Sequence, residues 1–489
     1  MKKRDPEPAK INYFFGPCWQ DLGSFIKEFW KLNAESINKR KEKYEAVGEK
    51  NKNGIMSFKG AVNFISCLFL ALFGTISFLI ISVAFSIVLS IGFFIVYIIS
   101  FIAWLIDRLY LMINGIFGAC PHCKKKYLIP TYICPSCGAK HKRLFPGKYG
   151  AFHRVCTCGK KIPSHFLTGR SKLSAECPYC GESLRGGESV PLYIPIVGGR
   201  SAGKTAFITA FTYQFIENVA RRKKLIVTHF SDESEQFYNN EIKNDYLNGT
   251  TRMTLTENNI NVESAKAFSF FVENDKLQPK REIRLYDIDG ESFVNNTENE
   301  IQLQYEYSQG IILIIDPLTI PTVRNALDST ASEIDKNSVG TIDTEIVINS
   351  FINKINDVIG RKQDALINVP VAVVISKADM AGMQEFLNED MIYDIIDKKS
   401  LEMDRYSDIE DAIVRQFLNK NDMQNLVKSI DTNFKSSRYF FCSAIGHVRE
   451  GGKYNPKGVL EPIEWICSIS DIGMKNAWNE QKFGKKFEL

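Results

Sequence analysis

A glycine-rich loop carries the clearest chemistry in the chain. The apolar run Leu192–Val197 leads into Gly198, Gly199, Arg200, Ser201, Ala202, Gly203, Lys204 and Thr205, and a helical stretch from Ala206 to Ala220 follows. In this pattern glycines let backbone N–H groups wrap phosphates, the lysine neutralises the β and γ phosphates, and the threonine hydroxyl coordinates Mg²⁺. The spacing predicts a strand, a phosphate-binding loop and a helix.

A second motif fits the same ligand. The expected strand Ile283–Asp287 ends in Asp287-Ile-Asp-Gly290, in which the Asp287 carboxylate would hold Mg²⁺ through water and the Gly290 amide would sense the γ-phosphate. Glu291 comes next, where a carboxylate can orient or deprotonate the attacking water, although its charge opposes that of the phosphate. A solvated residue without a catalytic role is the alternative for Glu291.

Two later motifs select the base. The expected strand Val371–Ile375 is followed by Ser376, Lys377 and Asp379, and a carboxylate at this strand end can accept from guanine N1–H and N2–H₂, a donor pair that adenine lacks. A further expected strand precedes Ser443 and Ala444, whose backbone can contact guanine O6. Because nucleotide crevices form at the carboxyl ends of parallel strands, these motifs favour GTP and GDP.

From about Pro191 to residue 470 the sequence resembles the translation-factor-related, Ras-like class of P-loop GTPases. The resemblance implies an α/β fold with a mostly parallel sheet and helices on both faces, Mg²⁺ as cofactor, and hydrolysis of GTP. Ser376 departs from the Asn or Thr of that class and loses the amide that braces the phosphate loop. An ATPase with Asp316 ending its Walker B strand is the alternative, and it leaves Asp379 and Ser443 unexplained.

The same loop, zinc-type cysteine pairs before the domain and the ending Gly458–Trp465 look like a group of bacterial proteins called double-GTPases. That resemblance implies a role within multi-gene systems and does not define the partner. We expect a protein effector or companion GTPase as partner. The segment Asn248–Arg252 is similar to the Gly-Thr-Thr-Arg switch of bacterial ribosome- and tRNA-linked GTPases, which makes Thr251, then Thr250, the candidate switch ligand of Mg²⁺. Thr254, Thr256 and an ordinary polar loop are the alternatives. Arg200 is either an arginine finger in cis or a surface residue.

Eight of the 12 cysteines fall in four close pairs, which predicts two Zn²⁺ sites of four thiolates each. Sequential pairing is the simplest assignment. It gives a first ribbon of Cys120, Cys123, Cys134 and Cys137 and a second of Cys156, Cys158, Cys177 and Cys180.

The 47 residues from Gly60 to Ile106 carry no formal charge, more than twice the roughly 20 that one spanning helix needs. We expect a two-helix membrane hairpin, Ala61–Ile81 and Ile87–Trp104, with Ser86, Ser90 and Gly92 as turn or packing positions. A single very long helix is the less favoured alternative. Lys and Arg crowd both flanks, so the positive-inside rule puts the N-terminus, the ribbons and the nucleotide domain in the cytosol. A soluble core helix would not run this long.

Ahead of the apolar stretch, aromatic and aliphatic residues repeat at helical spacing: Trp19, Leu22, Phe25, Ile26, Phe29 and Trp30. They predict an amphipathic helix that lies in the membrane interface or packs on another part of the protein. The expected domains are thus 1–60, a cytosolic basic segment; 61–106, the hairpin; 107–190, the ribbons; and 191–489, the GTPase.

Charge is unevenly distributed. Residues 107–190 carry 14 Lys/Arg against 4 Asp/Glu, whereas 191–489 carry 34 against 44. Two functions therefore compete: a membrane-anchored GTPase switch that recruits a partner, and an adaptor whose basic ribbons bind nucleic acid or a protein while GTP is bound without significant turnover. The sequence does not indicate an oligomeric state.

Overall fold

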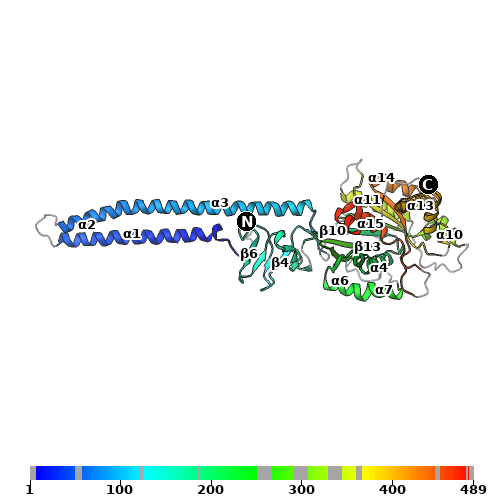
Figure 1. The fold of residues 1–489 in the computed structure, drawn as a ribbon, viewed down its shortest axis with the longest axis horizontal. Helices are drawn as coiled ribbons and strands as arrows, with labels where there is room; N and C mark the ends of the chain where they lie inside the picture. Colours follow the sequence, from blue (N-terminus) through cyan, green and yellow to red (C-terminus); the bar gives the residue numbers. More distant parts are fainter. Residues whose placement is uncertain are drawn as a thin grey trace. The chain divides into compact units, whose positions relative to one another are not determined.

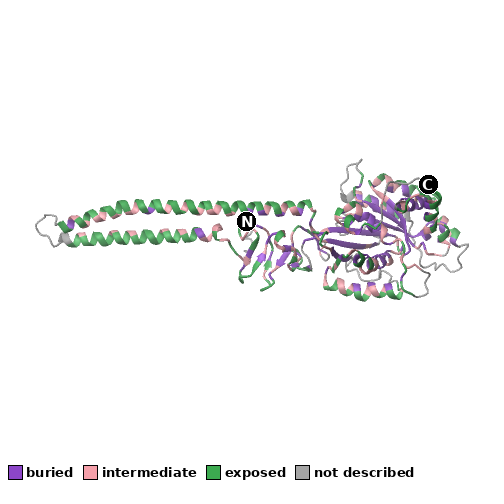
Figure 2. Ribbon diagram, in the orientation of Figure 1, coloured by how far each residue is buried: buried purple, intermediate pink, exposed green. Residues whose placement is uncertain are grey.

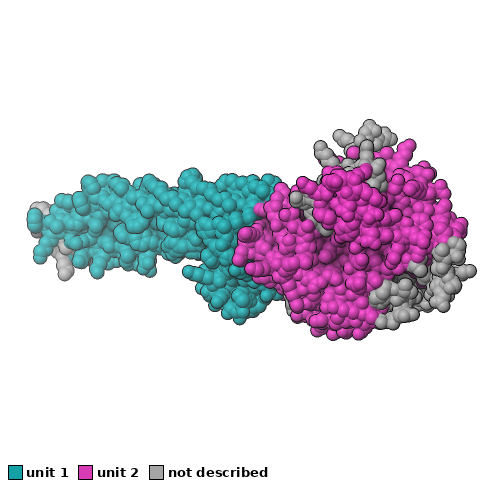
Figure 3. Space-filling view, turned by 45° about the vertical axis from the view of Figure 1, so that its right-hand side comes forward, with its two compact units in different colours: residues 1–113, 131–174 teal, residues 114–130, 175–489 magenta. Residues whose placement is uncertain are grey.

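The structure is a computed structural model that describes residues 7–49, 58–120, 123, 125–184, 188–250, 267–289, 307–328, 344–359, 366–380, 382–446, 452–480 and 483. Two compact units divide the chain: residues 1–113 with 131–174 form unit 1, and residues 114–130 with 175–489 form unit 2 (Figure 3). The boundaries of the four expected domains stay predictions, and the compact units cut the expected 107–190 segment three times.

Unit 1 contains a long antiparallel helix pair (Figure 1). The ring of Phe29 stacks on Phe78 with centroids 4.2 Å apart, and Tyr44 approaches Phe64 at 5.3 Å. The predicted amphipathic helix is therefore confirmed, and its aromatic face packs on the apolar helix. The elements are α1 (Pro17–Glu49), α2 (Phe58–Phe69), the π-helical segment η2 (Leu70–Gly74) and α3 (Thr75–Ile113).

The predicted turn within the apolar stretch is wrong. Ser86, Ser90 and Gly92 lie inside α3, and the helical run continues from Phe58 to Ile113. The stretch contains no proline, and the two serine hydroxyls donate to carbonyls four residues earlier, so nothing interrupts the helix. In the described part of the chain, this run alone is long and apolar enough to cross a membrane, and most of its side chains are exposed (Figure 2).

The rest of unit 1 is a small antiparallel fold that we call the inner ribbon, residues 131–174. The N-terminal strand joins it, because Ala9 and Lys10 pair with Cys156 and Val155. The strands are β1 (Ala9–Lys10), β4 (Thr131–Ile133), β5 (Lys140–His141), β6 (His153–Cys156) and β7 (Lys161–Pro163).

Unit 2 is built on a seven-stranded sheet in the order β11-β12-β13-β10-β14-β15-β16. Five strands from β13 to β16 are parallel, and β11 and β12 add an antiparallel edge. Apolar runs such as Ile311–Ile315 are buried throughout, as expected for strands covered on both faces. The strands are β10 (Val190–Gly198), β11 (Ile226–His229), β12 (Ala267–Glu273), β13 (Arg281–Asp289), β14 (Ile311–Ile315), β15 (Val371–Ile375) and β16 (Ser437–Phe441).

Helices cover both faces of this sheet, so the expected α/β architecture is confirmed. One face packs against α10 (Pro321–Asp328), α11 (Thr344–Ile359), α12 (Glu389–Lys398), α13 (Tyr406–Lys420) and α14 (Gln424–Asn433). The other packs against α4 (Lys204–Gln214), the π-helical η5 (Phe215–Ala220) and η6 (Tyr238–Ile242), α7 (Lys243–Asn248), α15 (Glu461–Ser470) and α16 (Ile472–Trp478). Two short helices, α5 (Arg221–Lys223) and α6 (Asp232–Phe237), precede and follow β11 in the sequence.

Unit 2 also holds a second cysteine-bearing fold, which we call the outer ribbon, residues 114–130 and 175–189. Its two hairpins are β2 (Gly118–Ala119) with β3 (Lys126–Tyr127), and β8 (Ala175–Glu176) with β9 (Ser183–Leu184). The buried guanidinium of Arg284 on β13 donates to the Ala119 carbonyl at 2.9 Å, and the Ala119 amide donates to the Tyr193 hydroxyl on β10 at 3.2 Å. The outer ribbon is thus part of the nucleotide-domain core.

Candidate functional site

The glycine-rich loop joins β10 to α4 in the predicted way, and two glycines are required by its shape. Gly203 has φ +89°, a left-handed conformation that other residues rarely adopt. At Gly198, a Cβ would lie 2.6 Å from the carbonyl oxygen of Ile314 on β14. The close approach of strand and loop therefore excludes a side chain there.

Lys204, at the start of α4, folds back over this loop. Its ammonium donates to the carbonyls of Gly198 at 3.0 Å and Gly199 at 2.9 Å, and the side chain is buried. The two carbonyls are neutral acceptors. They hold the Lys204 ammonium next to a loop whose backbone amides favour anions. The arrangement fits a phosphate group. Arg200 is exposed on the same loop.

Thr205 and Asp287 come together from α4 and β13. The Thr205 hydroxyl donates to Asp287 Oδ2 at 2.6 Å, although 82 positions separate the two residues. A hydroxyl and a carboxylate are the oxygen ligands with which this class of site holds Mg²⁺, directly or through water. The predicted pairing of these two motifs is therefore present in the geometry, and these two residues are the ones that would hold the ion.

The predicted base-selecting loop begins beside the phosphate loop. Ser376, the buried residue after β15, lies next to Gly203, since a Cβ on that glycine would be 3.9 Å from the serine Cβ. Its hydroxyl donates to the Ile315 carbonyl at 3.2 Å. Ser376 therefore bonds to a neighbouring strand end, not to the phosphate loop by a side-chain amide.

Asp379 lies close to the end of β16. The Ala378 amide donates to the Cys442 carbonyl at 3.1 Å. Burial raises the pKa of the Cys442 thiol well above its usual value, and the charge of Asp379 adds to the shift. Cys442 is therefore a core residue, and the Asp379 side chain is half-exposed at the strand end.

Ser443 and Ala444 follow β16 in a tightly closed turn. Ser443 exchanges two backbone hydrogen bonds with Lys457, and its hydroxyl accepts from the Gly446 amide at 2.9 Å. The turn is closed further at Gly446, where a Cβ would lie 1.8 Å from the Asn455 carbonyl oxygen. The backbone offered for base contact is thus fixed by the segment that precedes α15.

Three predicted residues, Thr251, Gly290 and Glu291, lie outside the described residues, as do Thr254 and Thr256. Thr250 is described: its hydroxyl donates to Asp245 at 2.8 Å, and its carbonyl accepts from the Tyr454 hydroxyl at 3.0 Å. In this structure Thr250 closes the end of α7.

Sequence reasoning gave Asp316 only as an alternative Walker B residue. Its buried carboxylate pairs with Lys377 at 2.5 Å, and its other oxygen accepts from the Leu318 amide at 3.0 Å. Asp316 therefore supports the Ser376–Asp379 loop. The sequence showed an acidic residue at the end of a buried strand. It did not show that the partner of this residue lies on another loop.

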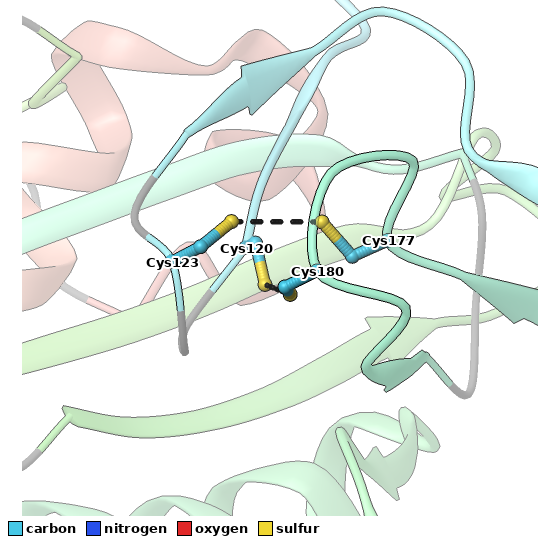
Figure 4. A group of neighbouring side chains, drawn as sticks. All are labelled: Cys120, Cys123, Cys177 and Cys180. Carbon is cyan, nitrogen blue, oxygen red and sulfur yellow. Dashed lines mark hydrogen bonds between the residues drawn. The ribbon is translucent and has the colours of Figure 1, made fainter.

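The eight cysteines form two groups whose sulfur atoms all lie within 4.8 Å of one another, so each group could hold a metal ion. Sulfur pairs are 3.5 and 3.7 Å apart in the outer ribbon (Figure 4) and 3.8 and 3.7 Å apart in the inner ribbon. A tetrahedral Zn²⁺ with Zn–S bonds of about 2.3 Å separates its sulfurs by about 3.8 Å, so both groups fit zinc. An amide N–H from Lys160 lowers the pKa of the Cys158 thiol.

The predicted sequential pairing is wrong. The first and last pairs form one group, and the two middle pairs form the other. The inner ribbon is thus inserted between the two halves of the outer ribbon, and spacing alone could not reveal this because any two close pairs satisfy tetrahedral geometry. The groups are Cys120, Cys123, Cys177 and Cys180, and Cys134, Cys137, Cys156 and Cys158.

Residues 192–431 match the family model for Double-GTPase 2. The nucleotide domain is a double-GTPase. The match covers β10 from Leu192, the phosphate loop, Asp287 and the Ser376–Asp379 loop, and it ends before Ser443. The double-GTPase family is a family of GTP-binding P-loop domains. The family match therefore confirms guanine nucleotides as the expected class of ligand. A search of curated proteins finds no match to the chain.

Proposed function

We propose that this protein is a membrane-anchored GTPase that binds Mg²⁺·GTP, hydrolyses it to GDP, and uses the two states to recruit a protein effector or companion GTPase at the membrane. The observation that carries the proposal is the 2.6 Å bond between Thr205 and Asp287 beside the buried ammonium of Lys204. These three groups supply the cation and the oxygen ligands that a nucleoside triphosphate with Mg²⁺ requires.

Each residue has a distinct part in this proposal. Lys204 exchanges its two carbonyl partners for the β and γ phosphates, while Thr205 and Asp287 hold the ion that neutralises those phosphates when bound. Asp379 accepts from the guanine edge, and the Ser443–Ala444 backbone meets O6. Gly290, Glu291 and Thr251 are the proposed groups that respond to the γ-phosphate and its attacking water.

The proposed anchor is the apolar run of α2, η2 and α3. The antiparallel pairing of β1 with β6 keeps the N-terminus on the same side as the inner ribbon, and the Lys/Arg residues that follow the apolar run favour the cytoplasmic side for both. The anchor predicts that the full chain stays in the membrane pellet after alkaline carbonate extraction. Quantitative release into the supernatant would contradict anchoring without bearing on nucleotide binding.

The nucleotide assignment is tested on the full chain in detergent, because a fragment starting near residue 185 would cut through the outer ribbon. We expect Mg²⁺-dependent binding of GTP and GDP with a clear preference over ATP. Asp379→Asn should move the preference toward xanthine nucleotides, whose exocyclic oxygen replaces the amino group. Equal binding of ATP, or an unchanged preference in the variant, would overturn the assignment.

A second candidate is an adaptor that binds GTP without significant turnover. The exposed lysines and arginines of the inner ribbon favour it, since they provide a binding surface separate from the nucleotide site. Single-turnover hydrolysis with excess protein separates the two. GDP formation that Glu291→Gln slows supports the GTPase, and GTP recovered intact from the wild-type chain supports the adaptor.

A further inference from the structure

The side-chain charge of the inner ribbon is strongly positive. Residues 131–174 contain nine Lys/Arg and no Asp or Glu. Arg154 and Arg170 are buried, and the other seven are exposed. Four thiolates with one Zn²⁺ contribute about −2, which leaves the segment well above neutral. Such a surface fits an anionic partner.

The two buried arginines are paired with acids from outside the segment. Arg154 bonds to Glu7 at 3.1 Å, and Arg170 bonds to Asp107 of α3 at 2.9 Å, with neither side chain of the second pair exposed. Asp107 is the first charged residue after the charge-free stretch that ends at Ile106. The ion pair therefore attaches the inner ribbon to the end of the proposed anchor.

Further contacts secure this attachment. The ring of Tyr110 stacks on Phe166 at 3.8 Å, and the Arg108 guanidinium lies 4.9 Å from the Phe145 ring. The Phe166 amide donates to Asp107 at 3.2 Å. On α3 itself, one face is buried at helical spacing: Ser100, Ala103, Asp107 and Leu111. Position and orientation of the inner ribbon at the helix end are thus fixed by the fold of unit 1.

Apolar side chains are exposed close to the same attachment. Leu167 is 69% exposed and directly follows Phe166, and Phe152 is 43% exposed while its carbonyl accepts from Ser164 and Thr168. An exposed aromatic and an exposed leucine on a segment that also carries exposed lysines and arginines are the side chains that bilayer interfaces favour. A nucleic-acid backbone would leave both apolar groups in water.

We propose that the inner ribbon binds anionic lipid headgroups, with its cationic side chains on the phosphates and Phe152 and Leu167 in the interface. The inference rests on the proposed membrane anchoring. The inner ribbon would add a second membrane contact. This contact depends on lipid charge, whereas insertion of the apolar helix does not depend on it. The cations that carry it are Arg143, Lys148, Lys160, Lys161 and Lys172.

The test uses the full chain reconstituted in nanodiscs of phosphatidylcholine alone or with 30 mol% phosphatidylglycerol, and lysine acylation by a water-soluble reagent read by mass spectrometry. Because an anionic surface attracts each nearby cation, we expect Lys160, Lys161 and Lys172 to react roughly fivefold more slowly in the anionic discs at low salt. The protection should vanish at about 0.5 M salt, where the screening length is only a few ångströms. Lys420 and Lys428, exposed on the double-GTPase domain, are the internal controls.

Two variants sharpen the test. Leu167→Ser with Phe152→Ser should weaken the protection of the three lysines, whereas Leu366→Ser, at an exposed leucine of unit 2, should not. Failure of the chain to enter either disc would remove the anchoring proposal itself. Entry with equal reactivity in both discs would overturn this inference alone. Protection by duplex DNA in neutral discs, without protection by anionic lipid, would also overturn it in favour of nucleic acid.

Discussion

The guanidinium of Arg284 donates to the carbonyl of Ala119, one residue before the first cysteine of the outer ribbon. The same guanidinium pairs with Glu282, and the Glu282 carboxylate accepts from Tyr193 at 3.3 Å and Ser189 at 3.2 Å. Tyr193 and Arg284 lie opposite each other on β10 and β13, the strands that lead to the phosphate loop and to Asp287. The outer ribbon and the nucleotide site are therefore built on the same two strands.

Arg284→Met is expected to destabilise unit 2 by about 3–5 kcal/mol, because it leaves the carboxylate of Glu282 buried without its cation. Hydrogen exchange of β10 and β14 peptides in the full chain measures this. Arg222→Met, at an exposed pair with Glu480, should change it by less than about 1 kcal/mol. The double variant Arg284→Met/Glu282→Gln should recover much of the loss, and no recovery would contradict the buried-charge explanation.

The two metal groups should differ in their effect on the nucleotide site. Cys180→Ser is expected to remove one zinc and to lower GTP affinity together with the stability of unit 2. Cys158→Ser, the matched exposed cysteine of the inner ribbon, should also remove one zinc but leave GTP affinity unchanged. Metal analysis and nucleotide titration measure both, and equal effects of the two variants on affinity would argue against the division of the ribbons between the units.

Lys204→Ala should abolish tight binding of GTP and GDP, because the phosphate loop would lose its buried cation. Asp287→Asn should weaken GTP binding in Mg²⁺ by at least about tenfold and GDP binding without Mg²⁺ much less, since the lost group acts through the ion. Asp275→Asn, an exposed turn residue, is the control for charge. Unchanged affinity in Lys204→Ala would remove the phosphate-loop assignment.

Asp316→Asn should preserve the hydrogen bond to Leu318 and lose the ion pair with Lys377. A charge-assisted bond contributes about 1.5–3 kcal/mol, so we expect GTP affinity to fall by about tenfold with the guanine preference kept. Isothermal titration with GTP, GDP and ATP gives both quantities. A complete loss of preference would instead mean that Asp316 acts on the base directly.

Glu410 provides a test of stability against pH. Burial is the main cause that raises the pKa of the Glu410 carboxyl well above its usual value. The hydrogen bond that the carboxyl accepts from the Phe441 amide, at 3.2 Å, opposes this shift. A raised pKa means that the folded chain holds the proton more tightly than the unfolded chain, so stability falls as pH rises above about 4.5. Glu410→Gln keeps an acceptor oxygen and should raise the unfolding temperature at pH 8, with a smaller gain at pH 5. A gain independent of pH would contradict this cause.

Local sequence determined a large part of this protein. The phosphate loop, the Asp287 motif and the Ser376–Asp379 loop were predictable because their chemistry resides in short contiguous patterns, each at a strand end. The metal-binding character of the eight cysteines and the helical character of the charge-free stretch were predictable for the same reason. Both depend on spacing or composition over a few residues or a few turns.

Tertiary structure alone decided which cysteine pairs share a site, whether the apolar stretch turns, and which residues support the loops. Pairing depends on where the chain returns, and the inner ribbon inserts between two halves that are distant in sequence. The apolar stretch forms one continuous helix, and α1 packs along it, with Phe29 stacked on Phe78. Asp316 with Lys377, and Arg284 with Ala119, are likewise partners across strands. Their charges and carbonyls must be satisfied once buried, and only the fold determines which partner is within reach.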